Sequence, residues 1–262
     1  MPGQDKPTHF LAKLSSCVDV GGGLIVTTTS SPSIFSEVCR RVLRPFIIGS
    51  CEDFEENIRL TSDIFDSHLN SLGVSRRSTR DWVVDVILQD FQNRNYVFSI
   101  LDVAEIVSDD FDFYNSSPSF LIDDRWYKKV TAKDLTRTDL FKRQYQSIGI
   151  AMLDYRVSIS SVLQIKDKSS LIHIESICSE LCLLHNEILN SDSSDKINEF
   201  IVVLNDLIST LPEEFIVTKI SLNDYVRVLS ELLYSGKLLE FNEFKQFWGR
   251  GQQYASFLKR YR

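Results

Sequence analysis

Glycine, proline and alanine are scarce in this chain of 262 residues, with 10, 6 and 5 copies. These low counts exclude a collagen-like repeat, a flexible linker and an alanine-rich coiled coil. The chain also lacks any run of about 18–20 uninterrupted apolar residues, the length that a membrane-spanning helix requires. Its first residues do not show the charged-then-apolar order of a secretory signal. The sequence therefore predicts no membrane partner.

The cysteine count is low and odd, which fits poorly with a closed framework of disulfides. We therefore predict a reducing compartment, either the cytoplasm or the nucleus. The five cysteines are Cys17, Cys39, Cys51, Cys178 and Cys182.

Compact catalytic motifs are missing as well. The sequence contains no phosphate-binding Gly-x-x-x-x-Gly-Lys loop, no His-Glu-x-x-His, no Gly-x-Ser-x-Gly and no Cys-x-x-Cys pair. With only four histidines, few imidazoles are available for general-base or metal chemistry. The sequence thus favours a protein that is not an enzyme, although catalytic carboxylates need no local signature.

What the chain does contain is enough apolar surface to fold. Hydrophobic residues make up 43% and charged residues 25%, which excludes global disorder. The 29 basic and 36 acidic residues give a net charge of −7, which argues against a surface that coats nucleic acid on all sides.

The first half of the chain has the signals of a mixed α/β region. A β-branched run predicts a strand over 24–29, and a second apolar run predicts another strand over 46–49. Between them, serine and proline at the start and proline after the end predict a helix over 31–43. Further helices are expected over 53–73, capped by an aspartate, and from residue 78 onwards.

The sign of the charge reverses near the middle of the chain. Residues 102–124 contain seven acidic and no basic residues, and 125–143 contain seven basic against two acidic ones. We interpret this reversal as the seam between two regions, 1–130 and 131–262. Within the first region, 78–130 is compatible with a winged-helix shape used for protein contact, because its acidic residues would repel phosphates.

The second half carries apolar stripes at helical spacing. They run over 141–162, 171–188, 197–208 and 222–233, and the connections between them are short. Exposing one stripe would cost more free energy than the ~5–15 kcal/mol that stabilises a domain, so the helices must pack together. The predicted fold class is mostly α (α+β), with a small mixed α/β N-terminal half followed by a C-terminal helical bundle.

Two weak chemical sites compete with structural interpretations. On one helix face, Cys178, Cys182 and His185 follow the spacing i, i+4, i+7 and could hold zinc, but the same positions belong to an apolar stripe. A carboxylate at Asp224, followed by Glu243 and Lys245, matches the loose pattern of metal-dependent nucleases. Against that pattern, Ser221 and Asp224 resemble a capping box, which would make Asp224 the third residue of a helix.

The C-terminal segment 244–262 combines five basic residues and six aromatic residues with no acidic ones. It could dock on the bundle as a last helix, bind a protein partner, or contact nucleic acid through phosphates and base stacking. The candidate contact residues in this segment are Lys245, Phe247, Trp248, Arg250, Tyr254, Lys259, Arg260 and Arg262. Those in the basic run are Arg125, Trp126, Lys128 and Lys129.

These observations lead to a functional hypothesis by elimination. We expect a non-enzymatic adaptor or regulatory subunit of an intracellular assembly that acts through a protein partner and needs no cofactor. One alternative is a nucleic-acid-associated subunit that contacts backbone phosphates through 125–143 and 244–262. A second alternative is a metal-dependent, nuclease-like enzyme whose site no motif reveals.

Overall fold

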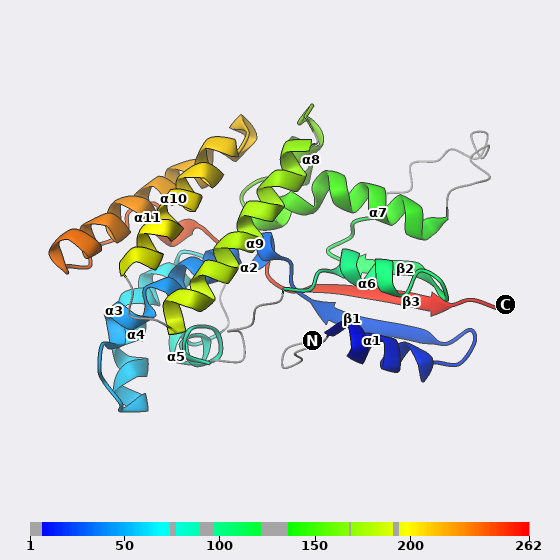
Figure 1. Ribbon diagram of the computed structural model, residues 1–262, viewed down its shortest axis with the longest axis horizontal. Coiled ribbons are helices and arrows are strands. Elements are labelled where there is room, and N and C mark those ends of the chain that lie inside the picture. The colour runs from blue at the N-terminus through cyan, green and yellow to red at the C-terminus, as the bar shows by residue number, and fades with distance from the viewer. Residues whose placement is uncertain are drawn as a thin grey trace.

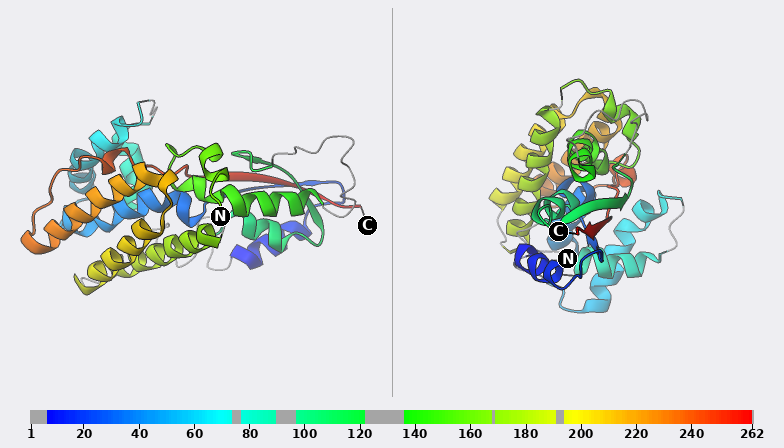
Figure 2. Two further views of the ribbon diagram at one scale, coloured as in Figure 1. Left: turned by 90° about the horizontal axis from the view of Figure 1, so that it is seen from above. Right: turned by 90° about the vertical axis from the view of Figure 1, so that its right-hand side faces the viewer.

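The computed structural model describes residues 7–73, 77–89, 97–121, 136–167, 169–190 and 194–261. The molecule is elongated, with most of its helices at one end and a small antiparallel sheet at the other (Figures 1 and 2). The predicted fold class, mostly α with a few strands, is confirmed. Within the part of the chain that the structure describes, no helix combines the length and apolar composition needed to cross a membrane.

The sheet has three strands in the order β1-β3-β2, and both pairings are antiparallel. Strand β1 (Gly23–Thr28) confirms the first predicted strand, and β2 spans Phe111–Ser117. Strand β3 (Gln253–Lys259) comes from the end of the chain and lies between the other two. A last helix, one of the alternatives for the C-terminal segment, is therefore wrong for residues 253–259, because they form their hydrogen bonds with two strands distant in sequence.

One face of the sheet is buried by three helices, α1 (Pro7–Ser16), α6 (Ile100–Ile106) and α7 (Arg137–Ile148). We call this cluster the sheet core. At its centre the ring of Phe113 stacks on Phe141 with 4.0 Å between centroids and meets Phe257 edge-on at 5.7 Å. The opposite face is exposed, as the 75% exposure of Ile25 shows.

The helical end is built around α2 (Ser31–Val42), which packs against α9 (Ser169–Asn190). Helix α9 packs in turn on α10 (Ser194–Thr210), and α10 on α11 (Ile216–Ser235). Helix α4 (Phe54–Asn70) lies beside α5 (Thr79–Trp82) and the π-helical turn Val83–Leu88. We call the cluster buried between these elements the helical core. The stripes predicted over 171–188, 197–208 and 222–233 are thus confirmed as helices.

The stripe at 141–162 is not one helix. Helix α7 ends at Ile148, a 3-10 turn follows over Gly149–Leu153, and α8 begins only at Ile159. The carbonyl groups of Ala151 and Met152 accept hydrogen bonds from Arg250 rather than from a following helical turn. The helical spacing of buried apolar residues therefore continues through 149–158, although the main chain there is not an α-helix and forms hydrogen bonds with a distant part of the molecule.

Two further predictions are wrong. Residues 46–49, expected as a strand, mostly belong to the short helix α3 (Arg44–Ile48). A run of four apolar residues is too short to distinguish the 3.6-residue period of a helix from the two-residue period of a strand. Helix α11 begins at Ile216, so Ser221 and Asp224 lie inside it and do not form its N-terminal cap. At its other end, Gly236 has the left-handed φ of 69° expected for a residue that ends a helix.

The two cores interleave along the chain. The helical core draws on residues 35–88 and 150–248, and the sheet core on residues 11–26, 98–152 and 255–257. Neither core is confined to one side of residue 130, so the charge reversal does not coincide with the division between them.

Candidate functional site around Trp248

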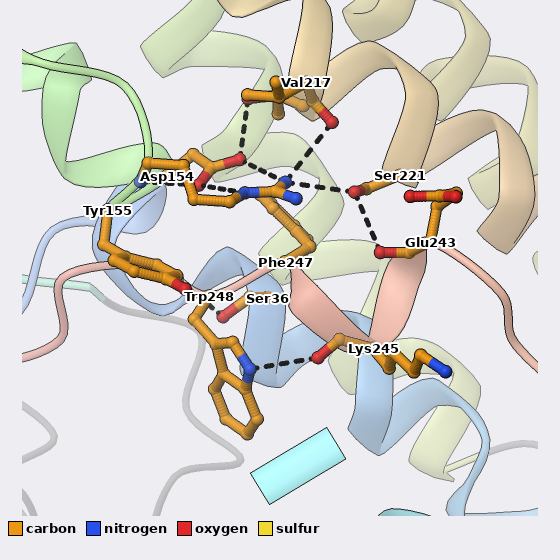
Figure 3. A network of polar contacts seen from close by, with 12 residues as sticks. Ser36, Asp154, Tyr155, Val217, Ser221, Glu243, Lys245, Phe247 and Trp248 are labelled. Carbon is orange, nitrogen blue, oxygen red and sulfur yellow. Dashed lines mark hydrogen bonds and ion pairs between the residues drawn. The ribbon is translucent and has the colours of Figure 1, made fainter. Parts of the chain in front are cut away.

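The segment 247–251 passes from the helical core to β3, and we call it the crossing segment. Four main-chain hydrogen bonds hold it in place. The N–H of Gly249 donates to Ser36 Oγ at 2.9 Å, and the N–H of Gly251 donates to the Ser33 carbonyl at 3.1 Å. From the other side, the N–H of Tyr155 donates to the Trp248 carbonyl at 3.0 Å, and the N–H of Arg250 donates to the Met152 carbonyl at 2.9 Å. The crossing segment is thereby fastened to α2 and to the loop before α8 (Figure 3).

The side chain of Trp248 is buried and fixed on three sides. Its Nε1 donates to the Lys245 carbonyl at 3.1 Å (Figure 3), and its ring meets Trp82 edge-on at 5.4 Å. The guanidinium of Arg40 lies 3.7 Å from the centroid of the Trp248 ring, within the range of a cation–π interaction. Burial lowers the pKa of Arg40 to about 9, so this residue stays charged at neutral pH.

A groove opens beside this indole, and we call it the Trp248 groove. Its cavity volume is about 510 Å³. Six of its lining side chains carry the argument below: Glu37, Arg77, Trp82, Tyr155, Trp248 and Arg250. They come from α2, the segment before α5, α5 itself, the loop before α8 and the crossing segment. Of these six, only Trp248 and Arg250 could be identified from the sequence, because no local pattern relates the other four.

A buried polar network supports the loop that carries Tyr155. The carboxylate of Asp154 is fully buried and pairs with the guanidinium of Arg156 at 2.7 Å. It also accepts a hydrogen bond from Thr218 Oγ1 on α11 at 2.9 Å. Arg156 donates to Ser221 Oγ, which donates in turn to the Glu243 carbonyl (Figure 3). The network joins the loop, α11 and the segment that precedes Trp248.

The predicted contact residues of the C-terminal segment are largely turned inward. Phe247 and Trp248 are buried. The guanidinium of Arg250 donates to the carbonyls of Ala151, Tyr155 and Val157 at 2.9–3.2 Å. Phe247 and Trp248 thus dock on the helical core, as the first alternative for this segment predicts. The guanidinium of Arg250 stabilises the fold through its hydrogen bonds to main-chain carbonyls.

The cations on β3 follow the same pattern. Lys259 Nζ donates to the carbonyl of Ser15 on α1 and to that of Val18 after it. Arg260, which follows β3, donates to the Ser108 carbonyl and pairs with Asp112. Tyr254 is 47% exposed and Lys245 is half-exposed, so these two residues remain accessible. Five more predicted contact residues lie outside the described residues: Arg125, Trp126, Lys128, Lys129 and Arg262.

The zinc alternative finds no support in the structure. Cys178 and Cys182 are buried in the helical core, and His185 on the same helix is also buried. Burial raises the pKa of Cys182 to about 12 and that of Cys178 well above its usual value, so both remain thiols, whereas zinc binds thiolates. Across the described ranges, no group of three His, Cys, Asp or Glu residues is placed to hold a metal ion. All five cysteines of the chain are free thiols.

The nuclease-like alternative is likewise unsupported. One carboxylate oxygen of Asp224 accepts hydrogen bonds from the main-chain N–H groups of residues 242, 243 and 244, at 2.7–3.1 Å. The other oxygen accepts from Arg227 at 2.7 Å. Both oxygens are therefore occupied, and the side chain of Glu243 is exposed. Asp224 anchors the 3-10 turn Phe244–Gln246 to α11 and does not meet Glu243 and Lys245 in a metal site.

Searches with the chain against protein-family models, curated proteins and solved structures found no match.

Two buried histidines predict that the protein loses stability in mild acid. Burial lowers the pKa of His68 to about 2 and that of His185 to about 3. Below pH about 6.5, the ordinary pKa of histidine, the unfolded chain therefore binds two protons that the folded chain does not bind. The free energy of unfolding should fall by about 2 kcal/mol between pH 7 and pH 5.5, measured by urea denaturation at each pH.

The matching control is His68→Leu, which removes one of the two titrating rings. It should reduce the pH dependence between pH 7 and pH 5.5 to about half. Glu37 and Glu175 oppose the effect as the pH falls through their pKa values, because burial raises the pKa of both carboxyls in the folded chain. A free energy of unfolding that does not change from pH 7 to pH 5.5 would show that these rings are protonated in the folded state.

Proposed function

We propose that this chain is a non-enzymatic adaptor or regulatory subunit that binds a partner protein at the Trp248 groove. The observation that carries the proposal is the composition of this groove. Tyr155, which is 42% exposed, lines it together with the buried rings of Trp82 and Trp248 and with Arg77. Tryptophan, tyrosine and arginine are the residues that dominate binding energy at protein interfaces.

The groove is also well ordered for binding. The crossing segment is held by main-chain hydrogen bonds to Ser33, Ser36 and Tyr155, and the Trp248 ring is fixed by Arg40 and Trp82. A surface whose side chains are already fixed loses little conformational entropy when a partner binds. This construction supports a binding site whose shape exists before the partner arrives.

The use of cations favours a protein partner over nucleic acid. Affinity for a phosphate backbone depends on lysine and arginine side chains that are available to neutralise it. Arg250, Lys259 and Arg260 instead donate to main-chain carbonyls of their own chain. The five free thiols support a reducing compartment, the cytoplasm or the nucleus, for this adaptor.

Site-specific photo-crosslinking tests the proposal. A photo-reactive amino acid is placed at Tyr155, which is 42% exposed in the groove, within the full-length chain in its own cells. We expect one crosslinked protein. In co-purification without crosslinking, we expect Tyr155→Ala to reduce the recovery of that protein by at least about tenfold, equivalent to 1.4 kcal/mol of binding.

The matched control places the same photo-reactive residue at Tyr234, which is 91% exposed on α11. This position should not crosslink the same protein. The adaptor proposal is overturned if the chain is recovered alone as a monomer that turns over a substrate, or if Tyr155 and Tyr234 crosslink the same set of proteins.

A further inference from the structure

We propose that strand β1 pairs edge to edge and antiparallel with β1 of a second copy of this chain. The two three-stranded sheets would then join into one sheet of six strands. The pairing surface is the outer edge of β1, at the end of the molecule away from most of its helices (Figure 1). The inference goes beyond the proposed function, because it concerns a surface other than the Trp248 groove.

The first observation is that β1 turns main-chain groups away from the sheet. The N–H of Lys259 donates to the Gly22 carbonyl at 2.9 Å, so Lys259 faces β1. Successive residues of an antiparallel strand bond to opposite sides. Phe257 therefore bonds to its register partner Leu24, and the next residue of β1, Ile25, turns its N–H and C=O outward. Among the described residues, none forms a main-chain hydrogen bond with these two groups.

The second observation is that the other edge of the sheet, β2, is closed. The N–H of Phe111 donates to the Val107 carbonyl and that of Phe113 donates to Thr138 Oγ1, both at 2.9 Å. Arg137 Nε donates to a further carbonyl of β2, and a bulge interrupts the register of this strand. Sheets in monomeric proteins protect their edges in such ways, because an unprotected edge pairs with other strands. Strand β1 has no bulge, no charged residue and no proline.

The third observation is the apolar surface beside the open edge. The side chain of Ile25 is 75% exposed and lies on the face of the sheet opposite the sheet core. On the same face of β3, Tyr254 and Leu258 are 47% and 42% exposed. An apolar side chain at an edge packs against a cross-strand neighbour when another strand is added there. A strand paired with β1 would therefore cover the most exposed of these side chains.

A second copy of β1 fits this edge because the strand is complementary to itself. A two-fold axis at Ile25 places this residue opposite Ile25 of the second copy, and each N–H then donates to the carbonyl of the other. The two isoleucine side chains lie next to each other on one face and shield each other from water. Since β1 carries no charge, the antiparallel pair brings no like charges together. Residues 25–28 are all β-branched, which favours extended pairing.

Sedimentation velocity of the full-length protein tests the pairing. We expect a monomer–dimer equilibrium with a Kd no weaker than about 100 µM. Ile25→Lys should weaken this association at least about tenfold, because two ammonium groups would meet at the two-fold axis. It should leave the melting temperature of the monomer unchanged, because the side chain is exposed. The matched control is Ile172→Lys on α9, which changes an isoleucine that is 62% exposed and should leave the Kd unchanged.

Hydrogen exchange followed by NMR locates the interface in the unaltered chain. The Ile25 amide should exchange at least about threefold more slowly at a protein concentration above the Kd than below it. The Val26 amide, which bonds to β3, should exchange at nearly the same rate at both concentrations. This measurement needs no substitution, so it tests the pairing even if Ile25→Lys does not fold.

Four results would each overturn the inference. They are a chain that stays monomeric at about 200 µM, a Kd that Ile25→Lys leaves unchanged, and protection of the Ile25 amide that does not depend on concentration. The fourth is protection that arises only when the protein crosslinked at Tyr155 is added, since that result would assign the edge to the partner. None of the first three bears on the adaptor function, which the crosslinking at Tyr155 tests separately.

Discussion

Replacing Gly249 with alanine should destabilise the protein by about 2–4 kcal/mol and disrupt the Trp248 groove. A Cβ at this position would lie 2.1 Å from the carbonyl oxygen of Ser33 and 3.3 Å from that of Met152. Both neighbours are main-chain atoms, which cannot rotate away as a flexible side chain can. The crossing segment would therefore have to move off α2 and lose the hydrogen bond from Gly249 to Ser36.

Urea denaturation gives the free energy of unfolding, and Gly23→Ala is the matched control. Gly23 has an ordinary φ, and the nearest atom to its added Cβ is 3.9 Å away, so its substitution should change stability by no more than about 0.5 kcal/mol. If Gly249→Ala and Gly23→Ala were equally stable, the close approach of the crossing segment to α2 would be incorrect.

Replacing Asp154 with alanine should cost about 3–5 kcal/mol. The substitution removes a fully buried carboxylate, so Arg156 loses its counter-ion and Thr218 loses its acceptor. An uncompensated guanidinium in a largely buried site is far more costly than the loss of an exposed ion pair. The loop that carries Tyr155 would lose its attachment to α11, so binding at the groove should fall together with stability.

The matched control for Asp154→Ala is Asp63→Ala. Asp63 also pairs with an arginine, Arg59, at 2.8 Å, but both side chains are more than half exposed. This change should cost less than about 1 kcal/mol. The double variant Asp154→Ala with Arg156→Met should recover part of the stability, because it removes the unpaired charge. Equal costs for Asp154→Ala and Asp63→Ala would contradict the role of the buried network.

The helices that could be predicted are those whose signals are local. Helix α4 begins after Asp53, whose side chain accepts a hydrogen bond from the N–H of Glu56 in the first turn. Helices α9, α10 and α11 each have a stripe of large apolar side chains at helical spacing, and Gly236 ends the last of them. Caps, stripes and terminal glycines act within a few residues, so the order of the amino acids is sufficient to locate them.

The elements that could not be predicted depend on distant partners. Residues 253–259 alternate between buried and exposed, but their pairing with β1 joins positions more than 220 residues apart, such as Gly23 and Leu258. The aromatic and basic residues of this segment are as compatible with a docked helix as with a strand, and only the pairing with β1 and β2 distinguishes the two. The prediction of one helix over 141–162 was wrong for a related reason, because Arg250 donates hydrogen bonds to the carbonyls of Ala151 and Met152 at its centre.

The candidate site shows the same limit. Trp248 and Arg250 could be named from the composition of the last segment, but not with the correct roles, because Arg250 is occupied by carbonyls of its own chain. Glu37, Trp82 and Tyr155 lie on three other segments, and each is ordinary in its local context. Their association arises only when α2, α5 and the loop before α8 pack around the crossing segment.

From its sequence alone, this chain is determined to be mostly helical, to bury a large apolar core and to carry no compact catalytic motif. Those properties follow from composition and from interactions between residues close in the chain. The tertiary structure alone decided that the last strand completes the sheet, that the C-terminal cations bind main-chain carbonyls, and that Glu37 faces a groove with three aromatic rings. Each of these depends on contacts between distant segments, whose free energy is gained only when the whole chain has folded.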